Sequence, residues 1–134
     1  MSPDDLVERF EFFDEWQERY AYIIDLGRKL EPMDAALKTE QSKVQGCLSQ
    51  VWMVCQPRPD GTLHFVADSD SAIVRGLIYL LLALYSDRTP ADMLTVDIDS
   101  VFGRIGLSQH LSPNRRNGFY SMVGRIRGEA ESRA

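Results

Sequence analysis

Cysteine and histidine are scarce in this chain, and this restricts the chemistry that it can carry. The 134 residues include two cysteines, Cys47 and Cys55, and two histidines, His64 and His110. These four residues form no closely spaced pair, whereas structural zinc sites are built from such pairs. We therefore expect no metal site.

Several other signatures are missing as well. There is no glycine-rich phosphate loop and no C-x-x-C redox pair, so we expect no resident cofactor. The start, M-S-P-D-D-L-V-E-R-F, lacks a basic segment followed by an apolar one, which favours a cytoplasmic location. The longest apolar run, Ala72 to Tyr85, contains Arg75 and is shorter than the ~20 residues that a membrane crossing requires. We interpret that run as a core helix and expect no membrane contact.

The charge is acidic overall but unevenly distributed. The formal net charge is -5, yet residues 104–134 hold six arginines and two glutamates. An acidic body with one local group of arginines, without interleaved surface aromatics, is a weak basis for nucleic-acid binding. We expect no nucleic-acid partner. The length suits a single domain, residues 1–134.

The first third of the chain shows helical periodicity. Leu6, Phe10 and Phe13 share one face of a short first helix. Asp14 with Gln17 resembles a capping box that starts a second helix, which we expect to continue to Leu30, just before Glu31-Pro32. The polar residues 33–42 predict a loop that leads into the segment around Cys47.

The remainder predicts a hairpin and further helices. The runs V-W-M-V-C at 51–55 and T-L-H-F-V-A-D at 62–68, joined by P-R-P-D-G, indicate an antiparallel hairpin. D-S-D-S offers caps for the helix at 72–85, and Thr89-Pro90 and Ser112-Pro113 each predict a helix start. This order predicts an α+β fold, with helices packed around a small antiparallel sheet of about three strands.

The two cysteines differ in their surroundings. Cys55 belongs to an alternating strand, where a free cysteine is most simply a small packing residue. Cys47 follows Gly46 in a polar segment where the backbone can bend and present a thiol. From the residues alone, Cys47 is either a reactive thiol or a residue beside a turn. A cysteine–histidine hydrolase has no local signature, and His64 and His110 are better explained as structural or surface residues.

Three segments resemble one known family, and this resemblance favours the interpretation of Cys47 as a reactive thiol. They are V-Q-G-C-L-S-Q-V-W at 44–52, A-D-S-D-S-A-I-V-R-G-L at 67–77 and Q-H-L-S-P-N-R-R-N-G-F-Y-S-M-V at 109–123. In this order they resemble the SufE family of sulfur-acceptor proteins, which includes the relative CsdE. One departure is Phe119, where the family usually has leucine, and we expect it to affect packing only.

The resemblance implies a function for Cys47. Members of this family accept sulfane sulfur from a pyridoxal-phosphate-dependent cysteine desulfurase of the SufS/CsdA kind. They hold it as a cysteine persulfide and pass it to an iron–sulfur cluster scaffold. Cys47 matches the acceptor, and Arg115 matches a family arginine that could favour the thiolate form. An ordinary surface arginine at a helix start is the alternative for Arg115. The chain would then be a transpersulfuration partner and activator of the desulfurase rather than a stand-alone enzyme.

The resemblance also implies a partner-binding surface. Asp70 falls in a segment that the family associates with desulfurase contact, and Gly46, Leu48 and Ser49 flank the acceptor cysteine. A persulfide is easily discharged onto other thiols, so we expect Cys47 to be guarded in the free protein. Leu48 and Val51 would lean on apolar surface, and Gly46 with residues 38–43 would act as the hinge.

The alternative function is an iron–sulfur cluster scaffold, or a non-catalytic interaction module of the assembly machinery. A scaffold needs about three or four protein ligands, commonly cysteines. Only Cys47 and Cys55 are present, and Cys55 is interpreted as structural.

Overall fold

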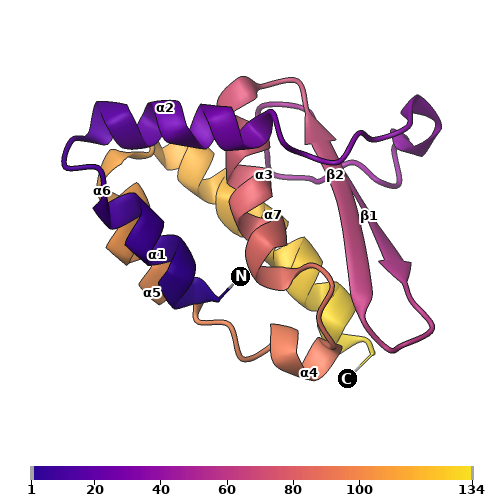
Figure 1. Ribbon diagram of the computed structural model, residues 1–134. Coiled ribbons are helices and arrows are strands. Elements are labelled where there is room, and N and C mark those ends of the chain that lie inside the picture. The colour runs from indigo at the N-terminus through magenta and orange to yellow at the C-terminus, as the bar shows by residue number, and fades with distance from the viewer. Residues whose placement is uncertain (1, 134) are drawn as a thin grey trace.

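The computed structural model describes residues 2–133 and shows an α+β fold in which helices and one hairpin surround a central helix (Figure 1). The first helices are α1 (Pro3–Glu11) and α2 (Trp16–Gly27), followed by a short 3-10 helix, η1 (Ala35–Leu37). The hairpin consists of β1 (Val51–Pro57) and β2 (Leu63–Ser69). The remaining helices are α3 (Ala72–Tyr85), α4 (Pro90–Met93), α5 (Ile98–Ile105), α6 (Leu107–His110) and α7 (Pro113–Glu131). The predicted fold class and hairpin are confirmed.

The sheet has two strands in the described part of the chain, rather than about three. β1 and β2 pair antiparallel from Val51 with Ser69 to Pro57 with Leu63. A third segment approaches β1 from its other edge: the Val44 amide donates to the Val51 carbonyl at 2.8 Å, and the Met53 amide donates to the Ser42 carbonyl at 2.8 Å. Pairing stops there because Gly46 has a φ of 88°, which turns the chain away from β1. The third segment is therefore one bridge rather than a strand.

Helix α3 forms the core of the molecule, as its apolar sequence predicts. Its buried residues are Ile73, Val74, Gly76, Leu77, Ile78, Leu80, Leu81, Leu84 and Tyr85. The Ser71 side chain accepts a hydrogen bond from the Val74 amide and so caps the helix start. In Figure 1, α2 crosses one end of α3 while α7 runs beside it. A Cβ on Gly76 would lie 2.1 Å from the Ile23 carbonyl oxygen, so the crossing of α2 and α3 requires glycine at this position.

Helix boundaries agree with the predicted caps in two places and differ in one helix. Thr89 caps α4 and Ser112 caps α7, each with proline in the first turn. The predicted capping box at Asp14 is wrong: Glu15 is the N-cap of α2 and makes no side-chain capping bond. Helix α2 also ends at Gly27, because the amides of the next three residues donate to carbonyls three positions back, a tighter turn than an α-helix.

Within residues 2–133, no helix combines the length and the apolar character needed to cross a membrane.

Candidate functional site around Cys47

The segment between residues 44 and 51 is a loop whose two ends are tied together. The Val44–Val51 backbone bond closes its base. Next to this base, the Gln50 amide donates to Asp70 Oδ1 at 3.0 Å, and the Asp70 amide donates to the Gln50 carbonyl at 3.3 Å. Asp70 is thus bonded to the C-terminal end of the loop that carries Cys47.

Gly46 and Cys47 lie directly against helix α7. A Cβ on Gly46 would lie 2.5 Å from Ser121 Oγ, so the positive φ and the close approach both require glycine there. Cys47 Sγ donates a hydrogen bond to the Gly118 carbonyl oxygen, which lies 3.5 Å from the sulfur. A Cβ on Gly118 would sit 3.4 Å from that sulfur, in close van der Waals contact with it.

The thiol of Cys47 is half-buried in this position. Burial disfavours the charged thiolate and therefore raises the pKa of Cys47 above its ordinary value. The hydrogen bond to the Gly118 carbonyl acts in the same direction, because only the protonated thiol can donate it. Both features favour the protonated thiol over the thiolate.

A cavity of about 390 Å³ opens beside Cys47, between the loop, α3 and the start of α7. One part of its lining is apolar, with Val74, Leu77, Phe119 and Met122. The rest is polar and consists of Ser49, Ser112, Asn114 and Arg115 together with the backbone of Gly118. Arg115, which sequence reasoning placed near the cysteine, is exposed and lines this same cavity. A small polar or anionic group could therefore enter beside the sulfur.

Leu48 does not behave as expected. Its side chain is 83% exposed, so it does not lean on apolar surface in the free protein. The turn at Gly46 directs the following residues along the outside of α7, which leaves Leu48 at the mouth of the cavity. Val51, by contrast, is fully buried as expected.

The polar run before the loop is held more firmly than its composition suggests. Ser42 is buried, and its hydroxyl donates to the Leu37 carbonyl at 2.7 Å and accepts from the Thr39 amide at 2.9 Å. On the other side, Arg125 of α7 donates to the carbonyls of Gln41 and Lys43. Sequence reasoning missed Gly118, Ser121 and Arg125, although their spacing along α7 indicates one helix face.

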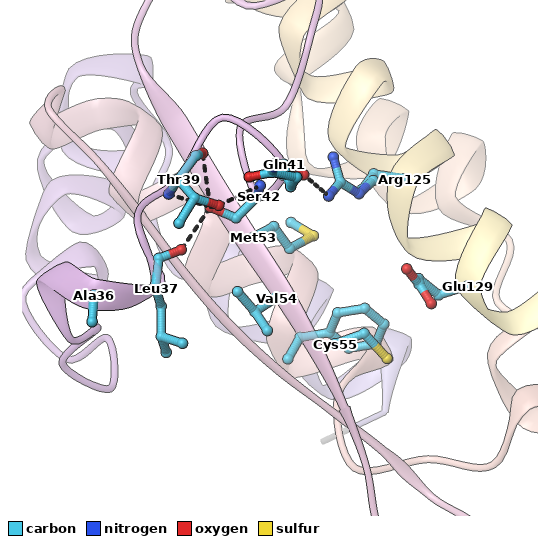
Figure 2. Close-up of a pocket in the computed structure, with 11 residues that line it drawn as sticks. Ala36, Leu37, Thr39, Gln41, Ser42, Met53, Val54, Cys55, Arg125 and Glu129 are labelled. Carbon is cyan, nitrogen blue, oxygen red and sulfur yellow. Dashed lines mark hydrogen bonds between the residues drawn. The ribbon is translucent and has the colours of Figure 1, made fainter.

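Cys55 lies in β1, as predicted, opposite Phe65. It borders a second cavity of about 300 Å³ between η1, β1 and α7, where Figure 2 shows its sulfur directed toward the helix. Burial, and next the negative charge of Glu129, raise the pKa of Cys55. This thiol is also held in its protonated form.

Both histidines are engaged away from Cys47. His64 bonds to Asp87 and Glu31 at 2.8 Å each, and His110 stacks on Trp16 with ring centroids 4.5 Å apart. His64 is thus held by two carboxylates and His110 is an exposed residue packed on Trp16, in agreement with the prediction of structural or surface histidines. Among residues 2–133, no three His, Cys, Asp or Glu side chains are grouped so that they could hold a metal ion.

Comparison with known proteins places this geometry in a family. Residues 4–130 match the SufE family model, described as an Fe-S metabolism associated domain. An uncharacterised SufE-like protein of Rhizobium meliloti is 44% identical over 98% of this chain and 96% of its own length. One from Rhizobium etli is 42% identical over 99% of this chain and 92% of its own.

A solved structure shares the fold. The solution structure of a hypothetical protein from Thermus thermophilus covers 99% of this chain and 98% of its own, with a TM-score of 0.78 at 17% identity. That likeness concerns the fold alone. The match over residues 4–130 and the two full-length relatives establish the rest: this chain belongs to the SufE family, and its role lies in iron–sulfur metabolism.

Proposed function

We propose that this protein accepts sulfane sulfur on Cys47 from a cysteine desulfurase and delivers it to iron–sulfur cluster assembly. The observation that carries the proposal is the position of Cys47: a thiol on a glycine-bent loop, half-buried beside an unfilled cavity that Arg115 also lines. Cys55 also borders a cavity but lies in a regular strand, so the bend at Gly46 and the nearby Arg115 are what distinguish Cys47.

The transfer step is an exchange between thiol and persulfide. The thiolate of Cys47 attacks the outer sulfur of the persulfide on the desulfurase cysteine, and a new S–S bond forms. The original S–S bond breaks, and the desulfurase cysteine leaves as a thiolate. No external oxidant is required, because the sulfane sulfur keeps its oxidation state. The same exchange in reverse roles passes the sulfur from Cys47 to a recipient thiolate on the assembly scaffold.

Transfer requires a change in the loop. The attacking species is the thiolate, whereas burial and the Gly118 carbonyl keep Cys47 protonated. Docking of the desulfurase would draw the loop off α7, which removes both effects and brings Arg115 into use as a positive neighbour of the sulfur. Guarding and low reactivity thus accompany each other in the free protein.

The surface around the loop suits a protein partner. Leu48 is one of two strongly exposed large apolar side chains in the described part of the chain, and it adjoins Cys47. Gly46, Ser49 and the exposed carboxylate of Asp70 complete the contact. An apolar anchor with a polar rim is the usual composition of a protein–protein interface.

The test compares the two cysteines. We expect Cys47→Ser to abolish sulfur acceptance from a desulfurase supplied with cysteine, and Cys55→Ser to leave it largely intact. Acceptance is measured as bound sulfane sulfur per chain after the desulfurase has been removed. Acceptance by the Cys47→Ser protein, or its loss in the Cys55→Ser protein alone, would refute the assignment of Cys47.

A further inference from the structure

Arg125 joins helix α7 to the chain just before the Cys47 loop. One of its terminal nitrogens donates to the Gln41 carbonyl at 2.8 Å, and the other donates to the Lys43 carbonyl at 3.3 Å. Figure 2 shows the guanidinium reaching from α7 toward Gln41, above the cavity that Cys55 borders. The planar guanidinium can hold two acceptors at once, which an ammonium group does less well.

The two carbonyls belong to a segment that is bound on both edges. The Ser42 carbonyl and the Val44 amide pair with β1, while the Gln41 and Lys43 carbonyls point the opposite way, to Arg125. Residues 40–42 form a turn and Lys43 bridges to Trp52. Arg125 therefore satisfies two carbonyls on the side of this turn and bridge that faces α7.

The same helix face continues to Cys47 itself. Gly118 touches the sulfur, Ser121 touches Gly46, and Arg125 holds residues 41 and 43. Positions 118, 121 and 125 follow one another at the three- and four-residue intervals that align side chains along a helix. The loop thus runs along one face of α7, with small residues where it approaches closely and an arginine at its base.

We propose that Arg125 is a positioning residue for Cys47. By anchoring residues 41–43, it keeps the loop seated on α7 and the thiol against the Gly118 carbonyl. This inference rests on the proposed function, because a loop seated on α7 protects Cys47 only if Cys47 is the sulfur acceptor. It concerns a residue that does not line the cavity beside Cys47 and that bonds to the base of the loop.

The proposal has a consequence for transfer. Suppose that the seated loop must be released before Cys47 can reach the partner's persulfide. The apparent affinity for the desulfurase is then the intrinsic affinity multiplied by the fraction of molecules whose loop is released. Loss of the Arg125 anchor would raise that fraction. The half-saturating concentration of the chain would then fall, while the rate at saturation would stay the same.

The experiment uses Arg125→Ala, Arg125→Lys and a matched control, Arg133→Ala. Arg133 lies two residues beyond the end of α7 and carries the same charge, but it bonds back to Glu129 and Ser132 rather than to the loop base. Each protein is treated with iodoacetamide without a partner, and labelling of Cys47 and Cys55 is quantified separately by peptide mass spectrometry. Hydrogen bonds from a charged donor are stronger than those between neutral groups, so their loss should favour the released loop. We therefore expect Cys47 to react about tenfold faster in Arg125→Ala. Arg125→Lys should be intermediate, and Arg133→Ala should match the unaltered protein.

Amide hydrogen exchange separates a positioning role from a general loss of stability. In Arg125→Ala, the amides of Val44 and Met53, which hold the segment to β1, should lose protection. Amides in the buried middle of α3 should keep theirs. If all of these amides lost protection together, Arg125 would be an ordinary structural residue and the proposal would be wrong.

The remaining outcomes are equally decisive. An unchanged Cys47 labelling rate in folded Arg125→Ala overturns the proposal, as does an equal acceleration in Arg133→Ala. In a titration with desulfurase, a lower half-saturating concentration at unchanged maximal transfer supports it, and a higher one contradicts it. Failure of the proposed function appears differently, as a lack of sulfur on Cys47 in the unaltered protein, whatever the labelling rates show.

Discussion

At the scale of single residues, the state of the Cys47 thiol governs what the site can do. Two features favour the protonated form, namely burial and the hydrogen bond to Gly118. Arg115 lines the adjoining cavity but is exposed to water, where a positive charge acts weakly on its surroundings. In the free protein the protective influences are therefore stronger than the activating one.

This balance predicts the pH dependence of Cys47 alkylation. Because the folded-state pKa is raised, the reactive thiolate forms only at higher pH than in the unfolded chain. The rate should rise with pH in both states, with the midpoint of the native profile above that of the protein in denaturant. The difference also contributes to stability: the contribution is present while the thiol is protonated and is lost as pH rises through the folded-state pKa. A native midpoint at or below the denatured one would show that Cys47 is activated in the free protein.

Asp70 combines two roles that substitutions can separate. Asp70→Arg reverses an exposed charge and removes the acceptor for the Gln50 amide, whereas Asp70→Asn removes the charge and keeps an acceptor oxygen. We expect Asp70→Arg to change desulfurase affinity several-fold in calorimetric titration, with the unfolding free energy altered by less than about 1 kcal/mol. If Asp70→Asn reproduces the effect, charge is responsible; if not, the bond to Gln50 is. Unchanged affinity in Asp70→Arg would remove Asp70 from the contact surface.

At the scale of secondary-structure elements, the close crossing of α2 over α3 depends on Gly76. Gly76→Ala would place a methyl group 2.1 Å from the Ile23 carbonyl oxygen, and the two helices would have to separate. We expect the unfolding free energy to fall by about 3 kcal/mol, at the upper end of usual overpacking costs. Chemical denaturation measures this directly.

The chain offers a matched control for this substitution. Gly124 lies on the exposed side of α7, and a Cβ there would meet nothing within 4 Å. Gly124→Ala should raise the unfolding free energy by about 0.5–1 kcal/mol, since alanine favours helix more than glycine does. Similar effects of the two substitutions would mean that helix propensity, rather than the α2–α3 crossing, determines the result.

Local patterns predicted the elements that depend on local physics. The hairpin follows from alternation and a turn, α3 from its apolar run, and the starts of α4 and α7 from Thr89 and Ser112. The pairing of residues 42–44 with β1 and the seating of the loop on α7 were not predictable in this way. The seating on α7 joins residues as far apart as Cys47 and Gly118, and the bridge to β1 depends on how the chain bends at Gly46; periodicity carries no information about either contact. The capping box at Asp14 failed because the chain starts α2 one residue later, with no side-chain cap.

The site residues likewise divide into those that the sequence indicated and those that it did not. The glycine before Cys47 signalled a bend, and the motif resemblance led to Arg115 and Asp70, which lie at the cavity and at the loop end. Leu48 was expected to be covered and is exposed, because the exposure of a side chain beside a turn depends on where the loop meets α7. Arg125 carried no signal that distinguished it from the other arginines of the helix.

At the scale of the whole molecule, the basic C-terminal part is less of a patch than its sequence suggests. Arg104 pairs with Asp4 at 2.9 Å, Arg125 is turned to backbone carbonyls, and Arg133 pairs with Glu129. Arg115 lines the Cys47 cavity. This distribution favours a local role in sulfur chemistry over a broad surface for polyanions.

The central claim is that Cys47 carries the sulfur, and intact-protein mass spectrometry tests it most directly. The protein is incubated with a cysteine desulfurase and cysteine, separated from the enzyme, and weighed without reduction, followed by peptide mapping. The account predicts a gain of one sulfur atom per chain, located on the peptide with Cys47 and removed by a reducing thiol. A chain that gains no sulfur, or gains it on Cys55, would contradict the account.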